Sequence, residues 1–319
     1  MAIKIFLALA AALVLIWGVV LWRAQARETK AEAAYPPQGR FVDVNGTRVH
    51  AVVMGEGPDL VLIHGSGGNT RDMTFRLAPA LAEDYRVIIF DRPGFGYTDR
   101  LEGDESIFAQ ADLLSQAAVK LGAETPLVLG QSYGGAVALA WAVEHHDRLS
   151  GLIPVSSPSH PWDAPLDPFY RITSSGFGQA VVVPLITAFA PHAYVASSLE
   201  SIFDPETPPD GYADHLGPGL TLRRVSMRAN AVQRATLLDE ITALAPRLDT
   251  IGVPTGIVHG TADTTVGMKI HAIPLSQTVD GATLTRVPEA GHMPHQTATE
   301  TVTAAVARAA ARAGLREQP

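Results

Sequence analysis

Six short, nearly continuous apolar runs alternate with longer helix-like stretches in this chain, and this alternation limits the folds open to it. The runs are Leu60–Ile63, Arg86–Phe90, Leu127–Leu129, Gly151–Val155, Gly256–Val258 and Thr283–Val287. Each run is short enough for a strand that is buried on both faces. Because such strands are separated by helices, the sequence predicts an α/β fold with a mostly parallel sheet.

An antiparallel hairpin is predicted before these strands. Asn45-Gly46 lies between the alternating apolar segments 41–44 and 48–54, and this dipeptide is typical of a two-residue hairpin turn. Helix-like stretches follow near residues 73–82, 106–121, 132–146 and 301–315.

The stretch 158–246 interrupts the alternation. It is much longer than the roughly 30 residues of a βαβ unit. It is rich in proline and contains the helix-like segments 178–189 and 220–244. We therefore expect a helical lid at 158–246, inserted into a core formed by residues 40–157 and 247–319.

The apolar run from Ile5 to Trp22 contains 18 residues and no charge. As a helix that rises about 1.5 Å per residue it is roughly 27 Å long, close to the hydrocarbon thickness of a bilayer. Trp17 and Trp22 fall where an interfacial aromatic belt would lie. Residues 1–30 are therefore predicted to form an uncleaved membrane anchor, followed by a linker at 31–39.

A cleaved signal peptide is the alternative, because Ala24-Gln25-Ala26 resembles a small-residue cleavage site. The apolar run exceeds the usual ~7–15 residues of such peptides, and Arg23 interrupts the approach to the site, which favours the anchor. Three basic residues follow the span, and by the positive-inside count they favour a cytoplasmic globular domain. Large domains are translocated across the membrane largely regardless of such charges, so we expect the globular domain on the extracytoplasmic side.

Composition excludes several classes of protein. With 32 acidic and 24 basic residues the net charge is −8, so we expect no nucleic-acid partner. The absence of cysteine excludes disulfide scaffolds, thiolate zinc sites, iron–sulfur clusters and a cysteine nucleophile. One cluster of arginines in the lid is interpreted as a solvated helix face and not as a site for an acidic substrate; it comprises Arg223, Arg224 and Arg228.

The pentapeptide Gly130-Gln131-Ser132-Tyr133-Gly134, here called the serine turn, follows an apolar run and opens an alanine-rich helical stretch. A G-x-S-x-G sequence between strand and helix lifts the serine hydroxyl above the sheet, and only glycine can flank the serine closely. Ser132 is therefore the candidate nucleophile. Because a serine hydroxyl is a weak nucleophile at neutral pH, it requires a base that a carboxylate orients.

Asp263 and His292 follow the serine in the order acid, then histidine, and each comes just after an apolar run. The carboxyl ends of strands are where ligands gather in open α/β sheets. His295 is the alternative base, but His292 stands first after its run and directly behind Gly291, so we prefer it. Asp263 also has the position of a helix N-cap.

A tetrahedral intermediate needs two backbone N–H donors for its oxyanion. Tyr133, the residue after the nucleophile, is expected to supply one. The glycine-rich loop of residues 64–68 follows an apolar run and is expected to supply the other, from Ser66 or alternatively Gly67. No Lys-Ser or Lys-Thr pair follows this loop, so it is not a Walker A motif.

These segments resemble the α/β-hydrolase superfamily, in its lid-bearing serine hydrolase subgroup, over nearly all of residues 40–315. The matching segments are His64-Gly65, Asp91–Thr98, Gly130–Gly135, Asp263 and Gly291-His292. The resemblance implies an α/β-hydrolase fold: a mostly parallel eight-stranded sheet, a helical cap inserted after strand six and, here, one N-terminal transmembrane helix before it. It also implies a Ser-His-Asp triad without cofactor or metal, and a mainly structural role for 91–98.

Departures from the family narrow the expected chemistry. Relatives that hydrolyse epoxides or carbon–halogen bonds carry aspartate where this chain has Ser132, and carbon–carbon bond hydrolases typically carry tryptophan near Met293. We therefore expect a serine hydrolase acting on a small-molecule carboxylic ester. The alternatives are carbon–carbon bond hydrolysis of vinylogous diketones, cofactor-free peroxidase chemistry and, least favoured, a non-catalytic binding domain. The lid, which no local motif describes, decides the substrate.

Overall fold

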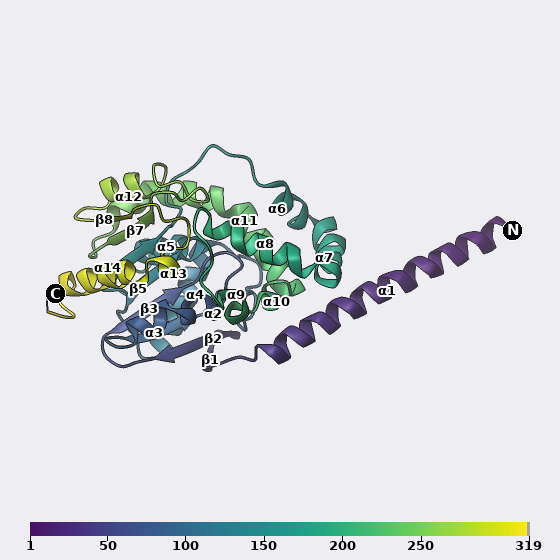
Figure 1. Cartoon of the computed structure of the whole chain (residues 1–319), viewed down its shortest axis with the longest axis horizontal. Helices are drawn as coiled ribbons and strands as arrows, with labels where there is room; N and C mark the ends of the chain where they lie inside the picture. Colours follow the sequence, from purple (N-terminus) through teal and green to yellow (C-terminus); the bar gives the residue numbers. More distant parts are fainter. Residues whose placement is uncertain (318–319) are drawn as a thin grey trace.

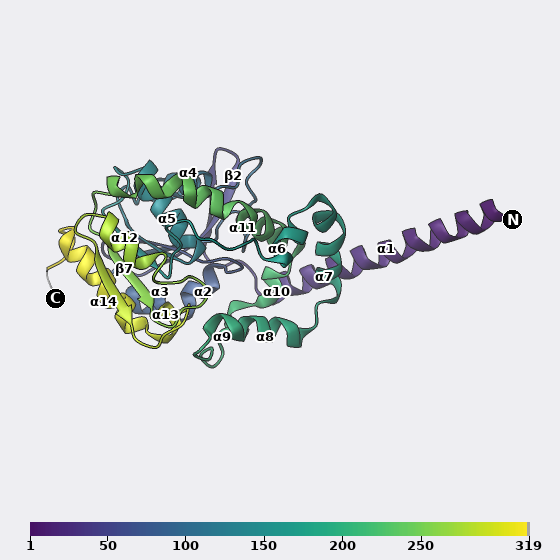
Figure 2. The same cartoon turned by 90° about the horizontal axis from the view of Figure 1, so that it is seen from above.

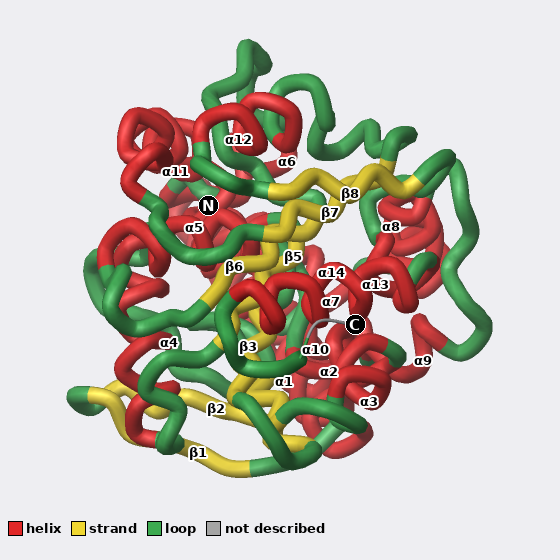
Figure 3. Tube along the Cα trace, turned by 90° about the vertical axis from the view of Figure 1, so that its left-hand side faces the viewer, coloured by secondary structure: helices red, strands yellow, loops and turns green. Residues whose placement is uncertain are grey.

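A mixed sheet of eight strands runs through the globular part of the chain, of which the computed structural model describes residues 1–317 (Figure 3). The strands are β1 (Arg40–Val44), β2 (Thr47–Met54), β3 (Asp59–Ile63), β4 (Arg86–Phe90), β5 (Leu127–Gln131), β6 (Gly151–Val155), β7 (Gly256–Gly260) and β8 (Thr283–Val287). Their order in the sheet is β1-β2-β4-β3-β5-β6-β7-β8. β2 is antiparallel to β1 and β4, whereas the other neighbouring pairs are parallel. The prediction of an eight-stranded, mostly parallel sheet is confirmed.

The turn between β1 and β2 has the predicted chemistry. Asn45 and Gly46 adopt φ values of 53° and 89°. Two successive positive φ angles characterise the hairpin turn whose twist matches that of the flanking strands, and the Asn-Gly pair tolerates them best. The predicted hairpin is therefore confirmed.

The strands are apolar on both faces because the sheet separates two cores. In β3, Val61 and Ile63 join one apolar cluster, whereas Leu60 and Leu62 join the other. The first cluster includes side chains of α4 (Ile107–Lys120), α5 (Tyr133–Glu144) and α12 (Ala272–Thr278). The second includes side chains of α2 (Thr70–Phe75), α3 (Leu77–Leu81) and α14 (Thr299–Arg312). Successive residues of a strand point to opposite faces, which explains the continuous apolar runs.

The predicted helix at 73–82 is two short helices, so that prediction was wrong in detail. Arg76 lies between α2 and α3 with a non-helical φ of −132°. Asn69 caps α2, because its side-chain oxygen accepts a hydrogen bond from the backbone of Arg71 at 2.9 Å. The helical segment therefore begins at Thr70, before the predicted residue 73, and is interrupted at Arg76.

The lid lies between β6 and β7 in the chain, as predicted. Its helical elements are α6 (Pro168–Thr173), a π-helical segment (Gly178–Val182), α7 (Val183–Phe189), α8 (His192–Phe203), α9 (Tyr212–Leu216), α10 (Pro218–Thr221), α11 (Arg224–Leu244) and a 3-10 segment (Ala245–Thr250). Side chains near the end of α11 belong to the same core as α4 and α5: Leu237, Ile241 and Leu244. The last lid helix is thus packed onto the sheet domain.

Helix α1 (Ala2–Ala34) extends away from the globular body (Figure 1). The predicted boundary after residue 30 is corrected, because residues 31–34 are helical and only residues 35–39 connect α1 to β1. Alanine and glutamate at 31–34 favour helix, whereas Pro36 and Pro37 end it. Within residues 1–317, α1 is the single continuous helix that is long and apolar enough to cross a membrane.

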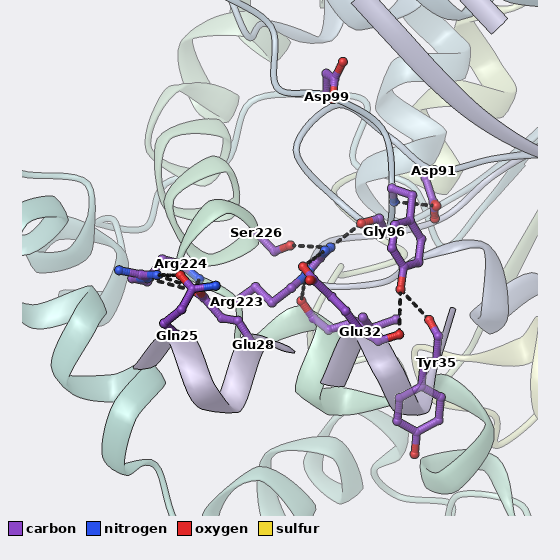
Figure 4. Close-up of polar contacts among 12 residues, drawn as sticks. Gln25, Glu28, Glu32, Tyr35, Asp91, Gly96, Asp99, Arg223, Arg224 and Ser226 are labelled. Atoms are coloured by element: carbon purple, nitrogen blue, oxygen red, sulfur yellow. Dashed lines mark hydrogen bonds and ion pairs between the residues drawn. The ribbon is translucent and has the colours of Figure 1, made fainter. Parts of the chain in front are cut away.

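The lid arginines bind other parts of the chain, so their interpretation as a solvated face was wrong. Arg224 donates to Glu28 and Arg223 donates to Glu32, both carboxylates of α1 (Figure 4). Arg228 donates instead to the backbone carbonyl of Gln179 in the lid.

Arg92, just after β4, is a fully buried cation that joins the glycine-rich loop to two helices. Its Nε donates to the carbonyl of His64 at 2.9 Å and its Nη2 to that of Gly65 at 3.1 Å. Its Nη1 donates to the side chains of Gln110 in α4 and Gln233 in α11, at 2.9 and 2.7 Å. Burial lowers the pKa of Arg92 to about 10, so the guanidinium remains charged at neutral pH. The predicted structural role of segment 91–98 is consistent with these contacts.

Replacing this cation should destabilise the fold strongly. Arg92→Met removes the Arg92 donor from four buried acceptors, and we expect the free energy of unfolding to fall by about 3–5 kcal/mol. Arg48→Met is the matched control, because the Arg48 side chain is 57% exposed in its ion pair with Asp99. Its loss should be under about 1 kcal/mol. Urea unfolding of both variants and the wild type in the same detergent would measure these losses of stability. Equal losses in the two variants would contradict the role given to Arg92.

Candidate active site

The serine turn holds Ser132 in a strained backbone conformation between β5 and α5. Its φ and ψ are 52° and −123°, a left-handed region that L residues rarely adopt. A Cβ atom at Gly130 would overlap the carbonyl of Gly134, and one at Gly134 would overlap the carbonyl of Ile63. The strand-turn-helix context and the glycine requirement inferred from the motif are therefore confirmed.

Three side chains from separate strand ends form one hydrogen-bonded series. Ser132 follows β5, Asp263 follows β7 and His292 follows β8. The Oγ atom of Ser132 lies 2.9 Å from Nε2 of His292, and Nδ1 of His292 lies 2.8 Å from Oδ2 of Asp263. Ser132, Asp263 and His292 expose only 9%, 8% and 4% of their surface. The structure therefore brings together the three residues that the sequence selected.

The Asp263 carboxylate is held by hydrogen bonds on both oxygens. Oδ1 accepts from the backbone N–H groups of Thr265 and Val266, each at 2.9 Å. No helix begins directly after Asp263, so its side chain caps a turn and not, as predicted, a helix. Burial alone would raise the pKa of Asp263, but donors on His259 and His292 and the Val266 N–H hold it well below its usual value. An ionised Asp263 favours the His292 tautomer with a proton on Nδ1, leaving Nε2 to accept from Ser132.

His259 is a second histidine that contacts Asp263, and it was not among the predicted site residues. Its Nε2 lies 2.7 Å from the carbonyl of Val266 and 3.3 Å from Oδ2 of Asp263. Since a carbonyl can only accept, Nε2 carries the proton. Nδ1 is buried and has no hydrogen-bond partner among the described residues. The available signal was its position at the end of β7, the same criterion that selected His292.

The glycine-rich loop lies against the serine turn. A Cβ atom at Gly65 would lie 3.1 Å from Cβ of Ser132, so the backbone that leads into Ser66 passes beside the serine. Gly67 has a φ of 67°, and its carbonyl accepts from Oγ1 of Thr221 in α10 at 2.6 Å. Tyr133 is the first residue of α5, so its N–H has no acceptor within the helix. These segments flank Ser132 from two directions.

His295, the alternative base, belongs to a different cluster. Its Nε2 lies 3.2 Å from Oδ1 of Asp72 in α2, which also accepts from the Tyr212 hydroxyl of the lid at 2.7 Å. The hydrogen bond to Ser132 is made by His292. Geometry therefore favours His292 over His295.

Among the side chains that the structure describes, which do not include that of residue 192, no three His, Asp or Glu residues are grouped so that they could hold a metal ion.

His64, within the glycine-rich loop, is required in its neutral form. Its Nδ1 donates to the carbonyl of Gly65 at 2.8 Å, and its Nε2 accepts from the backbone N–H of Arg92 at 2.9 Å. Burial and the neighbouring Arg92 charge lower the pKa of His64 to about 4. Burial, together with His259 and His160, likewise lowers the pKa of His271 to about 4.

These two histidines predict a loss of stability in mild acid. Their unfolded pKa is about 6.5, so between that value and about 4 the unfolded chain binds more protons than the folded one. The free energy of unfolding should therefore decrease as the pH is lowered, by about 2 kcal/mol per histidine from pH 7 to pH 5. In His64→Asn this fall should be smaller by that amount, whereas His146→Asn, at an exposed position, should leave it unchanged. Urea titrations at pH 7, 6 and 5 would show this, and an unchanged fall in His64→Asn would refute it.

Comparison with known proteins is consistent with this architecture. A family model described as alpha/beta hydrolase fold matches residues 58–183. Haloalkane dehalogenase 2 of Mycobacterium tuberculosis is 26% identical over 287 residues, which cover 85% of this chain and 94% of that protein.

Two solved structures extend the comparison. An alpha/beta hydrolase fold protein from Burkholderia ambifaria superposes with a TM-score of 0.69 at 26% identity, covering 84% of this chain and 96% of that one. A membrane phospholipase A, described as a bacterial virulence factor, superposes with a TM-score of 0.63 at 21% identity, covering 94% of each chain. A match of that extent leaves out fewer residues than α1 contains, so it includes part of α1.

Proposed function

This chain belongs to the α/β-hydrolase superfamily, and we propose that it is a serine hydrolase that cleaves carboxylic esters through Ser132, His292 and Asp263. The observation that carries the proposal is the series of hydrogen bonds from the Ser132 hydroxyl through His292 to Asp263, at 2.9 and 2.8 Å. A hydroxyl, a base and an orienting carboxylate in this order are what acyl transfer to serine requires.

Each residue then has a defined role. His292 takes the proton of the Ser132 hydroxyl as Oγ attacks the ester carbonyl carbon, and the ionised Asp263 stabilises the imidazolium that forms. The backbone N–H groups of Tyr133 and Ser66, or Gly67 in its place, donate to the oxyanion. His292 returns the proton to the leaving alcohol, and an acyl group remains on Ser132. Water activated by His292 then releases the acid and restores the serine.

The serine argues against the reaction named for the dehalogenase relative. Displacement of a halide from carbon in this fold uses an aspartate in the serine turn, and here the position is occupied by Ser132. His292 is also engaged with that serine, as acyl transfer needs. We therefore infer ester chemistry at this site, with a small-molecule ester as substrate and no cofactor.

We also propose that α1 anchors the protein in a membrane, with the globular part on the extracytoplasmic side. The length and apolar character of α1 support this, and most of its large apolar side chains are exposed in the isolated chain. Exposure of this apolar surface to water is unfavourable, whereas the hydrocarbon core of a bilayer provides an apolar environment of matching thickness.

Substitution of the serine tests the function. Ser132→Ala should lower kcat/KM for chromogenic acyl esters by a factor of about 10⁴ or more, because the nucleophile is lost. Ser157→Ala is the matched control: Ser157 is buried nearby, and its hydroxyl donates to the carbonyl of Pro158. That variant should stay within about threefold of wild type.

The assay should include esters of increasing acyl length and a vinylogous diketone. More than about a tenth of wild-type activity in Ser132→Ala would exclude Ser132 as the nucleophile. Hydrolysis of the diketone without any ester hydrolysis would replace the ester proposal by carbon–carbon bond hydrolysis.

A further inference from the structure

Helix α1 is clamped to the lid near its C-terminal end (Figure 4). Nη2 of Arg224 lies 2.7 Å from Oε2 of Glu28, while Nε and the backbone N–H of Arg224 donate to Oε1 of the same carboxylate. Nη1 of Arg223 donates to Glu32 at 3.0 Å. Both arginines stand at the start of α11, so these contacts give the lid a defined position along α1.

Lid helix α7 lies against the last turns of the apolar stretch of α1. Ala188 of α7 packs in a buried apolar cluster with Val20 and Ala24, and Trp17 packs against this cluster. Val20 and Trp17 belong to the apolar stretch that is expected to enter the bilayer. α7 therefore lies at the level along α1 where the apolar stretch ends.

Two arginines of α1 contact α7 and the residue after it, near the end of the apolar stretch of α1. Nε of Arg23 donates to the carbonyl of Ala188 at 2.8 Å, and Nη2 of Arg27 donates to that of Ala190 at 3.0 Å. The Arg23 guanidinium also lies 5.1 Å from the ring centre of Phe189. Arginines beside aromatic rings at the end of an apolar span are typical of the membrane–water interface.

The outward side of α7 is apolar, and Tyr194 is exposed at the start of α8. We define the apolar lid face by Leu185, Phe189 and Tyr194, whose side chains are 39%, 49% and 61% exposed. Together the segments 178–189 and 193–203 meet the length and hydropathy criteria of a membrane span, but a bend of 100° separates them. Such a bent pair suits helices that lie in the plane of the interface. Both views place α7 and α8 on the side of the body from which α1 extends (Figures 1 and 2).

We propose that the apolar lid face docks on the lipid bilayer that holds α1. The clamp and the buried contact between α7 and α1 place this face at the depth of the headgroups, and its exposed apolar side chains then enter the acyl boundary by about 5–10 Å. The face continues the apolar surface of α1, so one partner, the bilayer, covers both. The inference goes beyond ester cleavage and rests on the anchoring of α1 proposed above.

The absence of cysteine allows a direct test. Single-cysteine variants of the full-length chain would carry an environment-sensitive fluorophore in vesicles of phosphatidylcholine and phosphatidylglycerol. Phe189→Cys reports on the apolar lid face, and Leu13→Cys reports on the middle of α1. Ala304→Cys, at an exposed position of α14 far from the lid, is the matched control. Lipids brominated near the headgroup or deep in the acyl chain serve as quenchers.

The proposal expects quenching at Phe189→Cys at least about fivefold above that at Ala304→Cys, and stronger with shallow than with deep bromines. Leu13→Cys should be quenched most by deep bromines. Quenching at Leu13→Cys alone, with Phe189→Cys no different from Ala304→Cys, overturns the docking and keeps the anchor. No lipid quenching at either position overturns both.

A second copy of the chain is the other conceivable occupant. Self-quenching of the Phe189→Cys label without quenching by lipid would assign the face to a dimer and overturn the proposal. Tyr194→Cys on α8 repeats the measurement should Phe189→Cys fail to fold. None of the labelled positions is in the catalytic machinery, so ester hydrolysis by the same samples tests the proposed function separately.

Discussion

The left-handed backbone of Ser132 is the constraint on which the rest of the site depends. This conformation is unfavourable for a residue with a Cβ atom. It is held because α5 approaches β5 and the end of β3 so closely that only glycine fits at positions 130 and 134. The same bend directs the hydroxyl toward His292 and leaves the first N–H of α5 without an acceptor in the helix. Nucleophile and candidate oxyanion donor are thus positioned by one turn.

Two buried charges fix the surroundings of that turn. Asp263 remains ionised because backbone and histidine donors outweigh the cost of its burial, and it thereby orients His292. Arg92 joins the backbone of the glycine-rich loop to Gln110 in α4 and Gln233 in the lid. Thr221 adds a second link from the lid to Gly67. The lid therefore contacts both the loop beside the serine and α1, and residues 221–224 make contacts of both kinds. This places the proposed chemistry next to the proposed membrane contact.

The sequence pattern was sufficient to predict the sheet, the hairpin and the lid insertion. Strands buried on both faces appear as short apolar runs, and the hairpin turn appears as an Asn-Gly pair. The insertion appears as an interval between two such runs that is too long for one βαβ unit. The sequence pattern also selected Ser132, Asp263 and His292, since each stands at the end of an apolar run. The contacts of Arg223 and Arg224 with α1 join residues almost two hundred positions apart and leave no local signal. The second partner of Asp263, His259, and the helix break at Arg76 depend in the same way on packing that a window of sequence does not contain.

The most direct test of the central claim is to map, by mass spectrometry, the site at which a fluorophosphonate reacts with the folded full-length chain. Such reagents phosphonylate a serine whose hydroxyl is activated by a base. We expect a single adduct, on the peptide that contains Ser132, and no adduct in denatured protein. An adduct on another serine, such as Ser66, or an unmodified Ser132 in protein that hydrolyses esters, would contradict it.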